Sequence, residues 1–250
     1  MGYAILRIAK VKSLSAAHAI CRHNSRKVEV ITANPDIKNP KIIIPEVEEN
    51  QKNYPTYTKF FKAKTSGQTI RKDAVRALEL VMSFSKDSIK DSELRDWTKS
   101  CIEFIRENFG GSLSNLYDFQ LHTDEMGAPH CHALLICLDD KKKLNARYYV
   151  NGAKKLSDLQ DRYAEKMKPF GLERGKDKRL TKAQHKDSKQ WHKEQSEKET
   201  RLKTYEKLFG KPLDWNLTKR MHYYDVYEEI IKQNEKRNKK PKIRFNDIEK

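Results

Sequence analysis

The stretch that decides the fold is His122-Thr123-Asp124-Glu125-Met126-Gly127-Ala128-Pro129-His130-Cys131-His132, which the apolar run Ala133–Ile136 follows. Side chains alternate between the two faces of a strand, so His130 and His132 point to the same side, about 6.6 Å apart. Gly127 and Pro129 favour a turn, and an antiparallel hairpin would place His122 opposite the other two histidines. Three imidazoles on one sheet face form an open site for a divalent metal.

Around this hairpin, the apolar pattern predicts an α/β fold in which helices pack against an antiparallel sheet. The predicted strands are Tyr3–Val11, Leu78–Phe84, Leu116–His122 and His130–Leu138. The predicted helices are Leu14–Cys21, 92–108 and 156–168. Four prolines between residues 34 and 68 favour a loop with short extended pieces. We expect the metal site on the open face of the two central strands, which the hairpin supplies.

The charge of the chain points to a polyanionic partner, with nucleic acid first. Over 250 residues, 52 Lys and Arg stand against 35 Asp and Glu, a formal net charge of +17. Residues 1–138 hold 20 basic and 16 acidic side chains, a net of +4, and residues 139–250 hold 32 and 19, a net of +13. We therefore predict a catalytic domain over residues 1–178 and a basic, helical DNA-binding extension over residues 179–250.

Several classes of protein are excluded by the composition. No run approaches 18 consecutive apolar residues, so no membrane insertion is expected. The first 11 residues lack the features of a secretory signal. The four cysteines have no CxxC spacing, which favours reduced thiols in a cytoplasmic protein.

The histidine motif resembles the metal-binding motif of the HUH endonucleases, which cut single-stranded DNA. The fuller string HTDEMGAPHCH is similar to the third motif of the Mob/Pre plasmid mobilisation relaxases, HxDExxPHxH, with one more residue between Glu125 and Pro129. His23-Asn24-Ser25-Arg26 resembles the first motif of that family, HNxR, and Arg71-Lys72-Asp73-Ala74-Val75 resembles the second. Gly171–Lys176 is similar to a stretch that follows the metal motif, so the resemblance covers residues 1 to about 190.

The resemblance implies an HUH relaxase of the MOBV type. Such an enzyme nicks one DNA strand at an origin of transfer, stays joined to the 5′ phosphate and later rejoins the strand, which initiates plasmid transfer. By this resemblance, His23 is the nucleophile of a phosphoramidate intermediate, and Glu125 is our candidate for the carboxylate that orients it. His122, His130 and His132 would hold a divalent metal. Mn²⁺ is the first expectation, with Mg²⁺, Zn²⁺, Ni²⁺ and Co²⁺ as alternatives.

The resemblance also implies a set of DNA contacts. We expect Asn24 and Arg26 to hold the phosphates that flank the scissile one, with Arg26 as a bidentate fork. The other predicted DNA-binding residues are Arg71, Lys72, Arg174 and Lys176. The expected partners are single-stranded and hairpin DNA at the origin of transfer, together with a transfer coupling protein.

Two other interpretations stay open on the sequence. In the first, the chain is a rolling-circle replication initiator or another HUH nuclease whose nucleophile is a tyrosine, either Tyr163 or the pair Tyr223 and Tyr227. In the second, the chain binds DNA without cutting it, and a fourth ligand closes a structural metal site. Glu125, Asp124 and Cys131 are the candidates for that fourth ligand, although Cys131 points to the opposite face of its strand.

Overall fold

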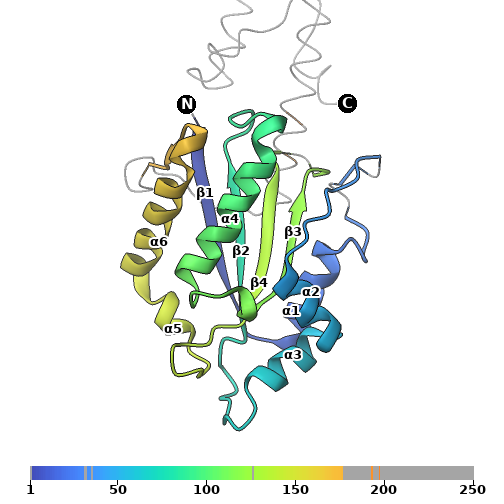
Figure 1. Ribbon diagram of the computed structural model, residues 1–250, viewed down its shortest axis with the longest axis vertical. Coiled ribbons are helices and arrows are strands. Elements are labelled where there is room, and N and C mark those ends of the chain that lie inside the picture. The colour runs from blue at the N-terminus through green and yellow to red at the C-terminus, as the bar shows by residue number, and fades with distance from the viewer. Residues whose placement is uncertain are drawn as a thin grey trace, which may run out of the picture. The chain divides into compact units, whose positions relative to one another are not determined.

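A five-stranded sheet lies at the centre of the part of the chain that the computed structural model describes (Figure 1). The described residues are 2–30, 33–34, 36–125, 127–176, 193 and 197. The chain divides into two units, residues 1–177 and 178–250, and the sheet belongs to the first. The strands are β1 (Gly2–Val11), β2 (Ala77–Phe84), β3 (Leu116–His122), β4 (His130–Leu135) and β5 (Leu172–Arg174). The α-helices are α1 (Leu14–Asn24), α2 (Pro45–Asn53), α3 (Tyr57–Lys64), α4 (Leu94–Asn108), α5 (Ala146–Tyr149) and α6 (Gly152–Met167).

The strands lie in the order β3-β4-β2-β1-β5. The pairs β3·β4, β4·β2 and β2·β1 are antiparallel, as predicted, but β5 pairs with β1 in parallel, so the sheet is mixed. The chain reaches β5 through α6, a helical crossover of the kind that parallel strands require. The prediction that both hairpin strands are central was wrong for β3. It forms an edge of the sheet, because β2 lies beside β4 on the inner side.

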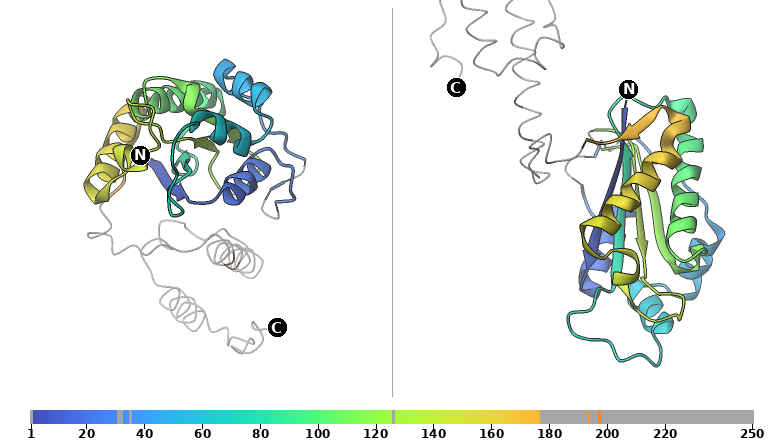
Figure 2. Two further views of the ribbon diagram at one scale, coloured as in Figure 1. Left: turned by 90° about the horizontal axis from the view of Figure 1, so that it is seen from below. Right: turned by 90° about the vertical axis from the view of Figure 1, so that its left-hand side faces the viewer.

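The two faces of the sheet differ, and β2 shows the difference most clearly. Leu78, Leu80 and Met82 are fully buried, whereas Glu79 and Val81, which alternate with them, are half-buried. The first set joins the core formed with α4 and α6. On the opposite face, α1 packs over one end of the sheet. Figure 2 shows α1 and α4 on opposite sides of the sheet.

The segment between β1 and β2 contains two helices that the sequence reading did not predict. We expected a loop there because of its prolines, but α2 begins at Pro45 and α3 is capped by Thr56, whose hydroxyl accepts from Lys59 N–H. A proline in the first turn of a helix loses no hydrogen bond and favours the helical φ angle. Pro45 and Pro55 therefore mark where helices begin, whereas Pro40 lies in the irregular segment that was predicted.

The other predicted helices are present with adjusted ends. The helix predicted over 92–108 is a 3-10 turn, Asp91–Glu93, that continues into α4. The helix predicted over 156–168 begins four residues earlier, at Gly152, and α1 continues three residues beyond Cys21. None of the helices in the described ranges is long and apolar enough to cross a membrane. The predicted extension over 179–250 lies outside the described residues, apart from two isolated positions.

Candidate active site

The β3–β4 hairpin brings the three histidines of the motif to one face of the sheet. His122 and His130 are register partners, and His132 pairs with Gln120. A β-bulge lies between Leu116 and Asp118, so that one extra residue of β3 faces β4. Because side chains alternate along a strand, this extra residue turns Asp118, Gln120 and His122 to the face opposite Leu116. Leu116 packs in the core with α4, whereas His122 faces the other side.

The imidazole rings of these histidines are close enough to share a ligand. Their centroids are 5.4 Å apart for His122 and His130, 4.9 Å for His122 and His132, and 5.0 Å for His130 and His132. His122 and His132 are buried, and His130 is partly exposed. The three rings thus lie together at one end of a sheet face whose other end carries the apolar cluster with α1.

Each of these rings has one nitrogen near an oxygen acceptor outside the cluster. His122 Nε2 lies 2.9 Å from the Asn24 carbonyl oxygen, His130 Nδ1 lies 3.2 Å from the Ala128 carbonyl oxygen, and His132 Nδ1 lies 3.4 Å from Glu79 Oε1. Since a carbonyl or carboxylate only accepts, the proton of each neutral ring is assigned to that nitrogen. His122 Nδ1, His130 Nε2 and His132 Nε2 then carry lone pairs, as metal ligands require.

The contacts of His122 Nδ1 test whether a cation fits this centre. This nitrogen is buried and has no hydrogen-bond partner within the described residues. The nearest acidic oxygen, Glu125 Oε1, lies 3.4 Å away. A lone pair and a carboxylate facing each other at this distance repel unless a positive charge lies between them. One set of potential ligand atoms, from His122, Glu125 and His130, lies within 4.8 Å of one another, and so does a second set from His23, His122 and His132.

The pKa values of two residues in the cluster, His130 and Glu125, are shifted. Burial, helped by the nearby His132, lowers the pKa of His130 to about 4. Burial alone would raise the pKa of Glu125, but its contacts with His122, His23 and Arg26 hold that pKa well below the ordinary range. At neutral pH, His130 is therefore a neutral imidazole and Glu125 a carboxylate.

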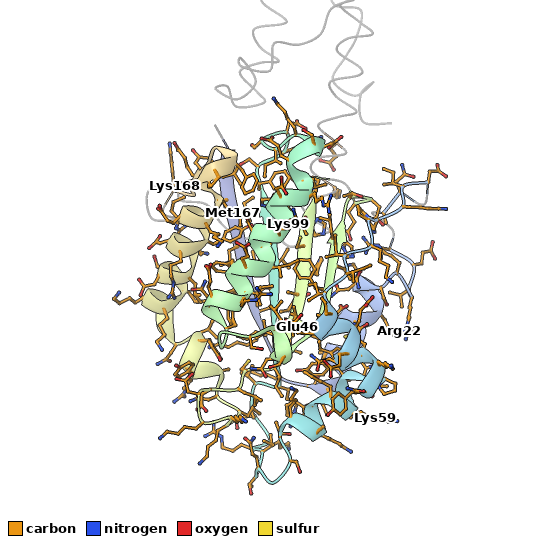
Figure 3. The ribbon with its side chains drawn as sticks, viewed as in Figure 1. Arg22, Glu46, Lys59, Lys99, Met167 and Lys168 are labelled. Carbon is orange, nitrogen blue, oxygen red and sulfur yellow. The ribbon has the colours of Figure 1, made fainter. Side chains whose placement is uncertain are left out.

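His23 lies beside the cluster, although it comes from a different element. The last turn of α1 carries it across the sheet face, so that its ring centroid lies 5.8 Å from that of His122 and 5.6 Å from that of His132. Its Nε2 lies 3.6 Å from Glu125 Oε1. About a third of the His23 side chain is exposed, the largest fraction among these four histidines. Figure 3 labels Arg22, its neighbour in the chain, well apart from Met167 at the end of α6.

Arg26 ties the end of α1 to the turn of the hairpin. Its side chain donates to both oxygens of Asp124, at 2.9 and 2.6 Å, and to Glu125 Oε1 at 2.7 Å. Its φ is +53°, in the left-handed region that favours glycine. Burial alone would raise the pKa of Asp124, but Arg26 and Asn39 hold it below its ordinary value. A contact between Arg26 and a DNA phosphate would compete with these two carboxylates.

Asn24, the other predicted phosphate ligand of the first motif, points inward. Its side chain is 2% exposed, and its amide nitrogen donates to Asp118 Oδ2 at 2.8 Å. A contact with a phosphate would require this amide to leave Asp118.

The remaining predicted DNA-binding residues do not join the cluster. Arg71 and Lys72 are exposed and precede the end of β2 that is remote from His130. Arg174, on β5 at the other edge of the sheet, donates to Asp161 and Gln160 of α6. Lys176 follows it and is exposed. The structure thus places these four side chains around the sheet rather than beside His23.

The candidate tyrosine in the described part of the chain lies on the face of the sheet opposite the histidine cluster. Tyr163 is fully buried in the core formed with α4, and its hydroxyl points to the Ser83 carbonyl oxygen at 3.4 Å. Burial raises its pKa well above the ordinary value, which disfavours the phenolate. Cys131 is also buried in this core, on the face opposite the histidine cluster. Tyr223 and Tyr227 lie outside the described residues.

Three residues at the site were not identified from the sequence. From the sheet, Glu79 contacts His132 and Asp118 contacts Asn24. Asn39 accepts from the backbone N–H groups of Thr123 and Asp124. Glu79 and Asp118 are single acidic residues within apolar strands, LELVMSF and LYDFQLH, and a charge in such a strand is a signal that could have been used. Asn39 lies in an irregular segment, where no sequence period singles it out.

Residues 1–193 match the sequence pattern of a family described as "Plasmid recombination enzyme", Mob_Pre. A "65 kDa protein" of Zymomonas mobilis is 32% identical over 177 residues, which are 69% of this chain and 30% of that protein. "Plasmid recombination enzyme type 1" of Staphylococcus aureus is 30% identical over 211 residues, 78% of this chain and 49% of that protein. The chain thus spans about half the length, or less, of these curated relatives.

Solved structures with a similar fold are described as the MobM relaxase domain (MOBV; Mob_Pre) bound to plasmid pMV158 oriT DNA, with manganese. One has a TM-score of 0.61 at 24% identity and covers 76% of this chain and 98% of that domain. Another has a TM-score of 0.59 at 25% identity, with 76% and 99% covered. The similarity confirms the predicted relaxase-type arrangement of a sheet flanked by helices.

Proposed function

Because the chain belongs to the plasmid recombination enzyme family, we propose that it is a relaxase that nicks and rejoins one DNA strand at an origin of transfer. The observation that carries this proposal is the position of His23. A partly exposed imidazole lies beside three histidines whose ring centroids are 4.9 to 5.4 Å apart, on the face of the sheet that α4 and α6 leave uncovered. The solved MobM domains, which are described as bound to oriT DNA, support the same class of substrate.

The residues of the cluster fit a divalent metal, and Mn²⁺ is the ion that we propose. His122 Nδ1, His130 Nε2 and His132 Nε2 would hold it, and Glu125 is close enough to act as a fourth ligand. When bound, such a metal acts as a Lewis acid on the scissile phosphate. Glu79 and the carbonyl oxygens of Asn24 and Ala128 keep the protons of the three rings away from the ligand positions.

His23 would act as the nucleophile. A nitrogen of its neutral ring forms a bond to the scissile phosphorus while the bond between phosphorus and the 3′ oxygen breaks, and the departing 3′ oxygen takes up a proton. The ring loses its own proton as the phosphoramidate forms. Glu125, ionised and 3.6 Å from His23 Nε2, stabilises the positive charge that develops on the ring. Attack of a 3′ hydroxyl on the phosphoramidate reverses these steps and rejoins the strand.

We propose that the substrate is held by basic groups outside the cluster. Arg71, Lys72, Arg174, Lys176 and the net +13 of residues 139–250 would bind the backbone of single-stranded and hairpin DNA at the origin. A transfer coupling protein is the further partner that we propose.

A chain ending near Leu180 should bind the origin more weakly and with a flatter salt dependence, by about 0.7–0.9 in slope for each lost phosphate contact. Equal salt-dependence slopes for the truncated and the full chain would show that the DNA-binding residues lie within residues 1–180.

Incubation with Mn²⁺ and a candidate origin oligonucleotide, followed by a denaturing gel, tests the proposed reaction. We expect a cleaved strand and a covalent adduct with the wild-type protein, neither product with His23→Ala, and both products with Tyr163→Phe. An adduct formed by His23→Ala would contradict the assignment.

The fourth potential ligand, Glu125, also fits a closed structural metal site in a protein that only binds DNA. Binding without cleavage in Mn²⁺, Mg²⁺ and Zn²⁺ would favour that second function.

A further inference from the structure

A buried hydrogen bond joins the last residue of α1 to the bulged part of β3. Asn24 and Asp118 are each 2% exposed, and the amide nitrogen of Asn24 donates to Asp118 Oδ2 at 2.8 Å. The other oxygen of Asp118 accepts from Gln120 Nε2 at 3.2 Å. Burying a carboxylate is costly, and within the described residues this one is hydrogen-bonded only to neutral amides. A group retained at such a cost is a candidate for a specific role.

The orientation of the Asn24 amide follows from its partner. A carboxylate of Asp118 only accepts, so the amide nitrogen must face it. Asn24 Oδ1 is then buried without a hydrogen-bond partner among the residues that the structure describes. Burial raises the pKa of Asp118, and its two amide donors oppose that rise. The hydrogen bond to Asp118 is thus the main polar contact of the Asn24 side chain.

The backbone of Asn24 makes a second connection to β3. Its carbonyl oxygen lies 2.9 Å from His122 Nε2, the contact that assigns the ring proton to Nε2 and leaves Nδ1 free. The preceding residue is His23, beside the cluster. One residue therefore connects the end of α1 to the sheet with its side chain, and to a metal-binding histidine with its backbone.

We propose that Asn24 and Asp118 form a positioning pair, which fixes the last turn of α1 against β3 so that the Asn24 carbonyl holds His122 in its ligating tautomer. The same hydrogen bond holds His23 beside the cluster, a consequence that rests on the proposed function. The bulge of β3 makes the pair possible, because it turns Asp118 to the face on which α1 lies. Neither side chain contacts DNA or metal in this role, which differs from the phosphate contact expected for Asn24.

Titration with Mn²⁺ in a calorimeter, with no DNA present, tests the pair through three variants of the full chain. Asp118→Ala removes the acceptor, and we expect it to weaken Mn²⁺ binding by about 10- to 100-fold, the usual cost of losing a partner that orients a ligand. Asp118→Asn keeps an oxygen that accepts from Asn24 while it removes the charge, so its affinity should stay within about 3-fold of wild type. Asn24→Ala should match Asp118→Ala.

Asn50→Ala provides the control for a merely structural effect. Asn50 is buried to a similar degree and also joins a helix to β3, through its amide and the carbonyl oxygens of Ser114 and Leu116. We expect this variant to lose stability, measured by denaturant unfolding, and to bind Mn²⁺ as wild type does. If Asp118→Ala fails to fold, Asn24→Ala, which removes the same hydrogen bond from the other side, decides the matter, and wild-type Mn²⁺ affinity in that variant would overturn the pair.

Two results would overturn the positioning pair. Wild-type Mn²⁺ affinity in Asp118→Ala would show that the hydrogen bond does not hold His122. Equal losses in Asp118→Asn and Asp118→Ala would show that Asp118 acts through its charge. Both outcomes are distinguishable from a failure of the proposed function, which would be the absence of DNA cleavage by a wild-type protein that binds Mn²⁺.

Discussion

On β4, Cys131, Ala133 and Leu135 point into the core with α4 and α6, whereas His130 and His132 point to the face where α1 lies. The same six-residue strand thus supplies both regions of the molecule. The core face is apolar and fully buried, so its side chains have few alternatives to their observed places. The opposite face holds the histidine cluster together with the carboxylates that accept from Arg26 and Asn24, next to the buried Leu134. The difference between the two faces suggests a division of roles. Apolar packing on one face fixes the strands, and the fixed strands keep the histidines and buried carboxylates of the other face in place.

Removal of one proposed metal ligand should have the largest effect and tests whether only one face of β4 binds metal. We expect His132→Ala to lower Mn²⁺ affinity by more than about 100-fold, because even the loss of a partner that orients a ligand costs about 10- to 100-fold. Calorimetry measures the affinity. The matched control is Cys131→Ala, one residue away on the other face, which should keep the affinity. A metal-binding defect in Cys131→Ala, or none in His132→Ala, would contradict the division of the faces.

Two neighbouring residues of β2 test the core face. Leu80→Ala should lower the free energy of unfolding by about 2–5 kcal/mol, the cost of a cavity in a packed core. Val81→Ala, on the half-buried opposite face, should cost less than about 1.5 kcal/mol. Denaturant unfolding without metal measures both. Similar losses at the two positions would show that both faces carry equal packing.

Added metal should stabilise the folded wild-type protein by binding to its histidine cluster. At a free Mn²⁺ concentration 100 times the dissociation constant, the free energy of unfolding should rise by about 2.7 kcal/mol. Cys131→Ala should gain as much, and His132→Ala, with its affinity at least about 100-fold lower, should gain no more than about 0.4 kcal/mol at the same concentration. Thermal melts with Mn²⁺ and with EDTA provide the measurement, and an equal gain in His132→Ala would place the metal elsewhere.

The smallest expected effect concerns the strained backbone at Arg26. Arg26→Ala and Arg26→Gly both lose the hydrogen bonds to Asp124 and Glu125, but glycine adopts the left-handed φ without steric cost. Arg26→Gly should therefore be more stable than Arg26→Ala by about 1 kcal/mol, measured by denaturant unfolding. Equal stabilities would show that the turn relaxes when the side chain is removed.

The hairpin and its histidines could be predicted because both rest on the two-residue period of a strand. That period placed His130 and His132 on one face, and the turn set His122 against them in the observed register. These features depend on local sequence, which a single chain shows directly.

The rest of the site depends on contacts that local sequence does not encode. Strict alternation along Leu116–His122 would put Leu116 and His122 on the same face, and only the bulge separates them. The position of Asn24 depends on how far α1 extends, and the sequence reading ended this helix at Cys21. The pairing of β5 beside β1 requires the whole crossover through α6 to be known.

The most direct test of the central claim is the identification of the residue that carries the DNA. The covalent adduct, digested at neutral or alkaline pH to preserve a phosphoramidate and analysed by mass spectrometry, should place the 5′ phosphate on His23, in a peptide from the end of α1. Acid treatment of the same adduct should release the DNA, since a phosphoramidate is acid-labile. An acid-stable adduct on Tyr163, or on any other tyrosine, would contradict the assignment of the chemistry to the histidine face of the sheet.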